Sequence, residues 1–281
     1  MPGWGRRDPR DPQPRGGAGH RRPGGGARGR PARAGARARR DAGRGRARLV
    51  PGRRGGSDGV RTLGALIWKD LITEARTREL VTSMSLVAFL ALVIMSLALG
   101  ASPDLAAAAA PGILWVTVSF AATLGLARSH ALEQERQALQ GLLLTPVSRS
   151  LLYLGKFGAN LVLVLILECV VVAAFAVLFA NDLGRRAGWI ALPLGLGAVG
   201  FTAVGTLLGA MTSSTRLREV LLPILLLPVA LPAIILSLAG IGAVLDGRAL
   251  ADLFRPAKML AAVDIIFIVL GMWLYGYAVE E

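Results

Sequence analysis

Apolar residues gather in six long stretches between residues 80 and 278, separated by shorter polar segments. A helix of roughly 20 residues, at ~1.5 Å per residue, crosses the ~30 Å hydrocarbon core of a bilayer, and each stretch reaches that length. The predicted spans are Leu80–Ala101, Ala106–Ala127, Phe157–Ala180, Gly188–Met211, Val220–Val244 and Met259–Ala278. The pattern predicts an all-α, polytopic membrane protein with six transmembrane helices.

The fifth stretch contains three prolines, Pro223, Pro228 and Pro232. Proline lacks the backbone N–H of a helical hydrogen bond, but membrane helices tolerate it where neighbouring helices satisfy the freed carbonyl groups. A kinked or broken fifth helix is therefore expected.

A short amphipathic segment precedes the first span. Its aliphatic residues share one helical face and its charged residues lie off that face: Leu63, Leu66, Ile67 and Leu71, against Lys69, Asp70, Glu74 and Arg76. Such a pattern is typical of a helix that lies in the membrane interface, and we predict a cytoplasmic interfacial helix over residues 61–79. A cytoplasmic extension of the first transmembrane helix fits the same residues, and both interpretations stay open.

The loop between the second and third spans, residues 128–156, is long and charged. Aliphatic residues alternate with acidic and basic ones at helical spacing from Leu132 to Leu143, and Gly141 and Pro146 punctuate the end. Such a helix could dock in a groove of a separate ATPase subunit, or simply rest on the membrane. The candidate coupling residues are Glu133, Glu135, Arg136, Leu139, Gly141, Leu142, Leu143 and Pro146.

The basic residues of the short loops predict the orientation. With the N-terminal end inside, the inner side carries ten Lys and Arg residues and the outer side five, so both termini should be cytoplasmic.

Net charge is concentrated at the start of the chain. Of the 32 Lys and Arg residues, 17 are arginines within residues 1–60, a segment built of Arg, Gly, Pro and Ala with Trp4 as its only aromatic residue. Such a segment cannot bury enough apolar surface to fold, and it lacks the interleaved aromatic residues that would stack on RNA bases. We predict a disordered tail without a nucleic-acid partner, and hypothesise that the native start lies downstream, near Val60.

No motif for catalysis is recognisable in the sequence. It holds neither a phosphate-binding loop nor a zinc-protease or nucleophile-elbow motif, so ATP hydrolysis is expected in a partner chain. The glycines at 195, 197 and 200 match a dinucleotide fingerprint but lie in the fourth span, where they favour close helix packing. The single cysteine, Cys169, is expected to be a buried thiol.

Two carboxyl groups fall within predicted spans and are the intramembrane polar candidates. Glu168 lies near the middle of the third span, with no basic residue in another span, and should face a helix interface or a polar cavity. Asp264 follows the start of the sixth span closely and could reach the membrane interface near Lys258. His20 and His130 lie outside the predicted spans, which disfavours a histidine-ligated cofactor in the membrane, and no metal site is expected.

Three segments resemble a known family, the heme exporter B proteins (CcmB family), which are membrane permeases of an ABC-type complex in bacterial cytochrome c maturation. The segments read LIWKDLITEARTRE at 66–79, PGILWVTVSFAATLGLARSHALEQERQALQGLLLTPVSRSLLYLGKFGAN at 111–160 and STRLREVLLPILLLPVALP at 214–232. The layout of six spans agrees from Thr62 to Tyr277. The family lacks the sixty-residue tail, which places the start site in doubt.

The resemblance implies a non-catalytic, multi-pass subunit of the bacterial inner membrane. It implies docking to a cytosolic ABC ATPase, which binds the ATP, through the helix from Glu133 to Leu144. Further implied partners are a heme-handling membrane protein, a small accessory membrane subunit and, indirectly, a periplasmic heme chaperone. Heme would be cargo of the complex, with no cofactor bound directly to this chain.

Two other functions fit the hydropathy pattern. One is the permease of another ABC exporter, for lipid, polysaccharide or drug. The other is an ion-coupled secondary transporter or channel with Glu168 and Asp264 as its relay, which would need no ATPase subunit.

Overall fold

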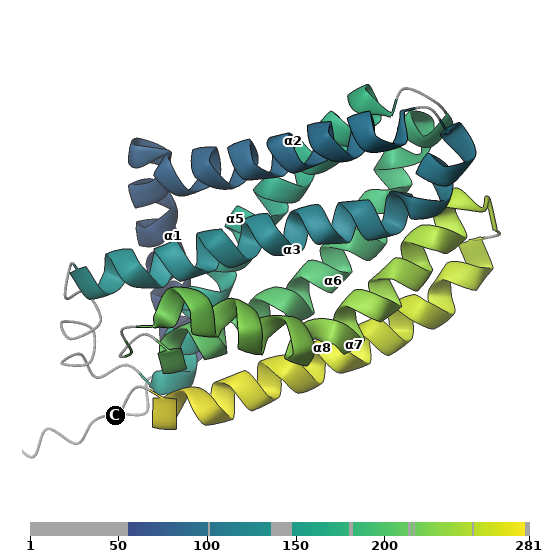
Figure 1. Ribbon diagram of the computed structural model, residues 1–281. Coiled ribbons are helices and arrows are strands. Elements are labelled where there is room, and N and C mark those ends of the chain that lie inside the picture. Colours follow the sequence, from purple (N-terminus) through teal and green to yellow (C-terminus); the bar gives the residue numbers. More distant parts are fainter. Residues whose placement is uncertain are drawn as a thin grey trace, which may run out of the picture. The chain divides into compact units, whose positions relative to one another are not determined.

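The computed structural model describes residues 56–100, 102–135, 148–179, 182–212, 215, 217–248 and 250–278, and in these ranges it contains helices and no strand. The helices are α1 (Gly56–Thr77), α2 (Glu79–Leu99), α3 (Pro103–Glu135), α5 (Arg149–Leu178), α6 (Asp182–Thr212), α7 (Arg218–Leu245) and α8 (Leu250–Ala278) (Figure 1). Residues 1–55 of the expected disordered tail lie outside the described residues.

Six of these helices, α2, α3 and α5 to α8, are long and apolar enough to cross a membrane. This confirms the all-α fold and the six predicted spans. The helices extend further than the apolar stretches did: α3 continues past Ala127 to Glu135, and α5 begins at Arg149 rather than Phe157.

Helix α1 is separate from α2. The helical conformation is interrupted at Arg78, whose backbone is left-handed with φ of 55°, and α2 starts at the next residue. In Figure 1, α1 turns away from the direction of α2 and crosses one end of the other helices. The segment is therefore a helix of its own and not an extension of the first transmembrane helix.

Helix α6 lies at the centre of the bundle and packs against α3, α5, α7 and α8 (Figure 1). Two of its glycines permit this. A side chain at Gly197 would collide with Trp115 of α3, and one at Gly200 would collide with Asp264 of α8. The glycine-rich segment thus serves close helix packing, as the sequence indicated.

Helix α7 is continuous despite its three internal prolines, so of the two expected forms, kinked or broken, the broken one is wrong. Helices α3, α6 and α8 pack around it. A polar bridge also fixes it to two of these helices, because Trp115 Nε1 donates to Ser237 Oγ at 2.9 Å and Ser237 Oγ donates to the carbonyl of Pro193 at 2.6 Å.

Candidate functional site

The two ends of the charged loop lie at the same end of the bundle as α1 (Figure 1). Glu133 and Glu135 belong to the last turn of α3, which is one unbroken helix from Pro103. The other candidate coupling residues lie outside the described residues: Arg136, Leu139, Gly141, Leu142, Leu143 and Pro146. The chain returns at Ser148, and α5 starts at Arg149.

Hydrogen bonds attach the first turns of α5 to the bundle. Arg149 Nη1 donates to the carbonyl of Gly276 at 3.3 Å, and Ser150 Oγ donates to the carbonyl of Met272 at 3.2 Å, both on α8. One turn further on, the hydroxyl of Tyr153 donates to the carbonyl of Ala203 on α6 at 3.0 Å. The exit of the loop is thus fixed to two core helices.

Helix α1 packs closely on α5 because α5 presents glycines to it. A Cβ at Gly155 would lie 3.0 Å from the side chain of Leu66, and one at Gly158 would lie 2.7 Å from that of Ile67. The aliphatic face of α1 recognised in the sequence therefore packs against a protein helix.

The charged face of α1 is also turned partly into the protein. Lys156 of α5 is only 9% exposed, and its Nζ lies 3.6 Å from Oδ2 of Asp70. Glu74 is buried and its Oε1 accepts a hydrogen bond from the backbone N–H of Val81 at 2.9 Å, which satisfies one of the free N–H groups at the start of α2. These contacts fix α1 to both helices, around a polar pocket of about 250 Å³.

A line of polar side chains continues from this pocket into the bundle. Ser129 Oγ donates to Oδ1 of Asn160 at 3.2 Å, and Nδ2 of Asn160 donates to Oγ1 of Thr206 at 3.1 Å, which joins α3, α5 and α6. His130 is buried beside Gly209 of α6, and its Nδ1 lies 2.8 Å from the carbonyl oxygen of Leu126. His130 was expected outside the spans, but α3 carries it into the packed interior.

The two intramembrane carboxyl groups both lie against α6. Glu168 is 5% exposed, with its Oε2 about 3.7 Å from where a Cβ of Gly195 would be. Asp264 is 4% exposed and packs against Gly200. Along α8, which starts at Leu250, this carboxyl group lies roughly 20 Å from the start of the helix at ~1.5 Å per residue. That it reaches the membrane interface near Lys258 stays a prediction.

Cys169 also differs from expectation. It is exposed on α5, next to the buried Glu168, and is not a buried thiol. Among the described residues, no group of three or more His, Cys, Asp or Glu side chains is placed to hold a metal ion.

Sequence reasoning did not single out the polar junction of Asp70, Glu74, Lys156, Ser129 and Asn160. One signal was available: Lys156 stands beside two closely spaced glycines, Gly155 and Gly158, which is the small-residue pattern of helix contacts.

Comparison with known proteins gives one family. The family model described as CcmB protein matches residues 61–281, which include α2 to α8 and most of α1. No curated protein matches the chain. Because the match covers far more than half of the sequence and every predicted span, this multi-pass membrane protein belongs to the CcmB family.

Proposed function

We propose that this chain is the membrane permease subunit of an ABC-type complex that supports heme export for the maturation of c-type cytochromes. Membership of the CcmB family over residues 61–281 supports a heme-transport permease. The protein would lie in the bacterial inner membrane, with both termini in the cytoplasm, as the excess of basic residues on the side of α1 indicates.

Continuity of α3 is the structural observation that carries the coupling mechanism. One helix connects the buried Trp115 to Glu133 and Glu135 at the edge of the loop. A partner that moves the helix end moves the core side chains with it, because an unbroken helix transmits displacement along its axis. The fixed exit of the loop would hold the start of α5 in place while the end of α3 moves.

The proposed partners and cargo follow from the family. A cytosolic ABC ATPase would dock on the loop and bind the ATP. A heme-handling membrane protein and a small accessory membrane subunit would complete the complex, and a periplasmic chaperone would receive the heme. Heme would be cargo of the complex, and this chain would bind no cofactor of its own.

A pull-down from detergent-solubilised membranes tests the docking. Wild type is compared with the triple variant Glu133→Ala, Glu135→Ala, Leu139→Ala, and copurified ATPase and heme are measured. The matched control carries Asp246→Ala and Arg248→Ala, which remove an exposed ion pair within the short connection from α7 to α8. We expect the ATPase with wild type and control but not with the triple variant, and absence of an ATPase from all three would refute the proposal.

A helix break separates docking from coupling. Leu132→Pro interrupts α3 near its end, at a cost of about 3 kcal/mol in helix stability, whereas Leu132→Ala leaves the helix intact. The proline variant should still copurify with the ATPase but lose formation of c-type cytochromes. Equal activity of both variants would show that α3 does not transmit the movement.

A second candidate, ion-coupled transport, has one observation in its favour. Oε1 of the buried Glu168 has no hydrogen-bond partner among the described residues. An unbonded carboxyl oxygen of this kind is available to bind and release a proton. Glu168→Gln together with Asp264→Asn would abolish a carboxyl relay but should leave an ATP-driven permease active, so cytochrome formation by the double variant distinguishes the two functions.

A further inference from the structure

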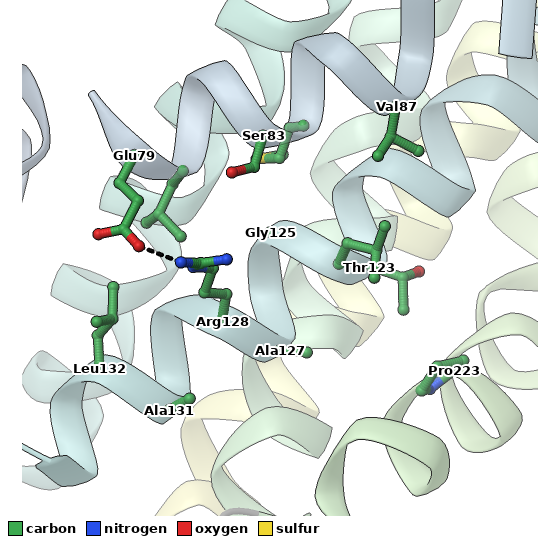
Figure 2. Close-up of a pocket in the computed structure, with 13 residues that line it drawn as sticks. Glu79, Ser83, Val87, Thr123, Gly125, Ala127, Arg128, Ala131, Leu132 and Pro223 are labelled. Carbon is green, nitrogen blue, oxygen red and sulfur yellow. Dashed lines mark hydrogen bonds and ion pairs between the residues drawn. The ribbon is translucent and has the colours of Figure 1, made fainter. Parts of the chain in front are cut away.

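A pocket of about 560 Å³ opens between α2 and α3, with Pro223 of α7 at its edge (Figure 2). Helices α2 and α7 each pack against α3 but not against each other over the described residues, so α3 is the floor of a groove between them. Within the lining, Met84 of α2 lies over Gly125 of α3, which lets these two helices approach closely.

The pocket is polar at one end and apolar at the other. At the polar end, Nη2 of Arg128 donates a hydrogen bond to Oε1 of Glu79 (Figure 2). On α2, Ser83 and then Val87 follow Glu79 at intervals of one helical turn. On α3, Leu124 lines the pocket one turn before Arg128, and the exposed side chains of Phe120 and Val116 continue the same face of α3 beyond the pocket.

Together, the pocket and the exposed face of α3 that continues from it extend over about one leaflet. Glu79 is the first residue of α2 and Arg128 lies near the end of the apolar part of α3, so the ion pair is at the level of the membrane surface. From Arg128 to Val116 the helix rises roughly 18 Å at ~1.5 Å per residue, which is close to half of a ~30 Å hydrocarbon core. The apolar face thus matches a single acyl chain.

The charges select the headgroup. The side chains of Arg128 and Glu79 are 51% and 43% exposed. Their shared hydrogen bond uses only part of what they offer, because a guanidinium carries five N–H donors and a carboxylate about four acceptor sites. A phosphate suits Arg128 and a primary ammonium suits Glu79, whereas a purely anionic headgroup is repelled by Glu79 and a choline group has no N–H to donate.

We propose that this pocket binds a phospholipid with an ethanolamine headgroup. Its phosphate contacts Arg128, its ammonium contacts Glu79, and one acyl chain lies along the exposed face of α3. This site does not depend on the transported cargo or on the ATPase partner.

Native mass spectrometry of the full chain in detergent micelles tests the site. Phosphatidylethanolamine, phosphatidylglycerol and phosphatidylcholine with identical chains are added at equal concentration. Because one charge-assisted hydrogen bond contributes about tenfold in affinity, wild type should prefer phosphatidylethanolamine over each of the other two by about that factor. Equal binding of the three lipids, or a preference for phosphatidylglycerol, overturns the proposal.

Variants assign the preference to the pocket. Glu79→Gln should raise binding of phosphatidylglycerol to the level of phosphatidylethanolamine, a gain that misfolding cannot produce. Arg128→Gln should weaken both lipids, and Ala127→Phe should do the same by filling the pocket while keeping its charges. The control is Arg248→Gln, in the exposed ion pair with Asp246, which should bind as wild type.

Two further results would overturn the proposal. One is an Arg248→Gln variant that behaves as Arg128→Gln does, since the effect would then be general charge. The other is a wild-type dimer that Ala127→Phe dissociates without any lipid preference, since the groove would then hold a second copy of the chain.

Discussion

Replacing Asp70 with asparagine removes a negative partner of Lys156, a lysine that the fold has buried. Lys156 keeps only 9% of its surface exposed, and its Nζ lies 3.6 Å from Oδ2 of Asp70. At that distance the attraction is about 5 kcal/mol for an effective dielectric constant of roughly 20. Breaking a fully buried pair from one side costs about 3–5 kcal/mol. Because the Asp70 side chain is 26% exposed, we expect a smaller loss, about 2–4 kcal/mol.

Removing the lysine instead of the aspartate should cost much less stability. In Lys156→Met the buried positive charge is removed, and Asp70 keeps its contact with Lys69, at 3.3 Å, and with solvent. We expect a loss of about 1 kcal/mol or less. The double variant Asp70→Asn, Lys156→Met should resemble Lys156→Met alone, because the cost in Asp70→Asn comes from the lysine left behind.

Thermal unfolding of the purified protein in micelles, followed by tryptophan fluorescence, measures these differences. A change of 1 kcal/mol shifts the Tm by about 2–4 °C for a chain of this size, so Asp70→Asn should lower the Tm by roughly 5–15 °C. Lys69→Met, at the half-exposed partner of Asp70, is the control and should change the Tm by no more than about 3 °C. Equal losses for Asp70→Asn and Lys156→Met, or additive losses in the double variant, would refute the reasoning.

Three further predictions use the same measurement. Gly271→Ala forces the ring of Tyr153 away from its hydrogen bond to Ala203, so it should destabilise the protein by about 1–3 kcal/mol, and Tyr153→Phe should not add to that loss. Ser237→Ala removes the bridge between Trp115 and Pro193 and should cost about 1–2 kcal/mol; an unchanged Tm would mean that the bridge does not hold α7. On α5, Leu167→Ala should cost about 2–5 kcal/mol because Leu167 is buried, whereas Cys169→Ala should be nearly neutral, and the opposite order would mean that α5 faces the other way.

The six spans could be predicted because the transfer of apolar side chains from water to lipid dominates the hydropathy pattern. The ends of the helices could not, because a helix is continued by its backbone hydrogen bonds and not by its hydropathy. Lys156 and His130 looked like loop residues for that reason, yet α5 and α3 carry them into the bundle. The polar segment before Met259 is helical as well, although hydropathy alone starts the sixth span only there.

Which side of a membrane helix faces protein is harder to predict than where the helix lies along the sequence. Lipid and protein interior are equally apolar, so Cys169 among apolar neighbours could be assigned to either, and the structure places it on the exposed side. Glycine spacing is more informative, since Gly197 and Gly200 mark where α3 and α8 approach α6.

The amphipathic pattern of α1 predicts one environment for its two faces, and the structure shows another. An aliphatic face opposite charged residues predicted a helix on the membrane surface, with its charges in water. In the structure, Leu66 and Ile67 instead cover glycines of α5, and Asp70 and Glu74 engage α5 and the start of α2. A helix held by both kinds of contact cannot move independently of the span that follows the charged loop. If the loop docks an ATPase, α1 and the first turns of α5 therefore form the fixed support against which α3 moves.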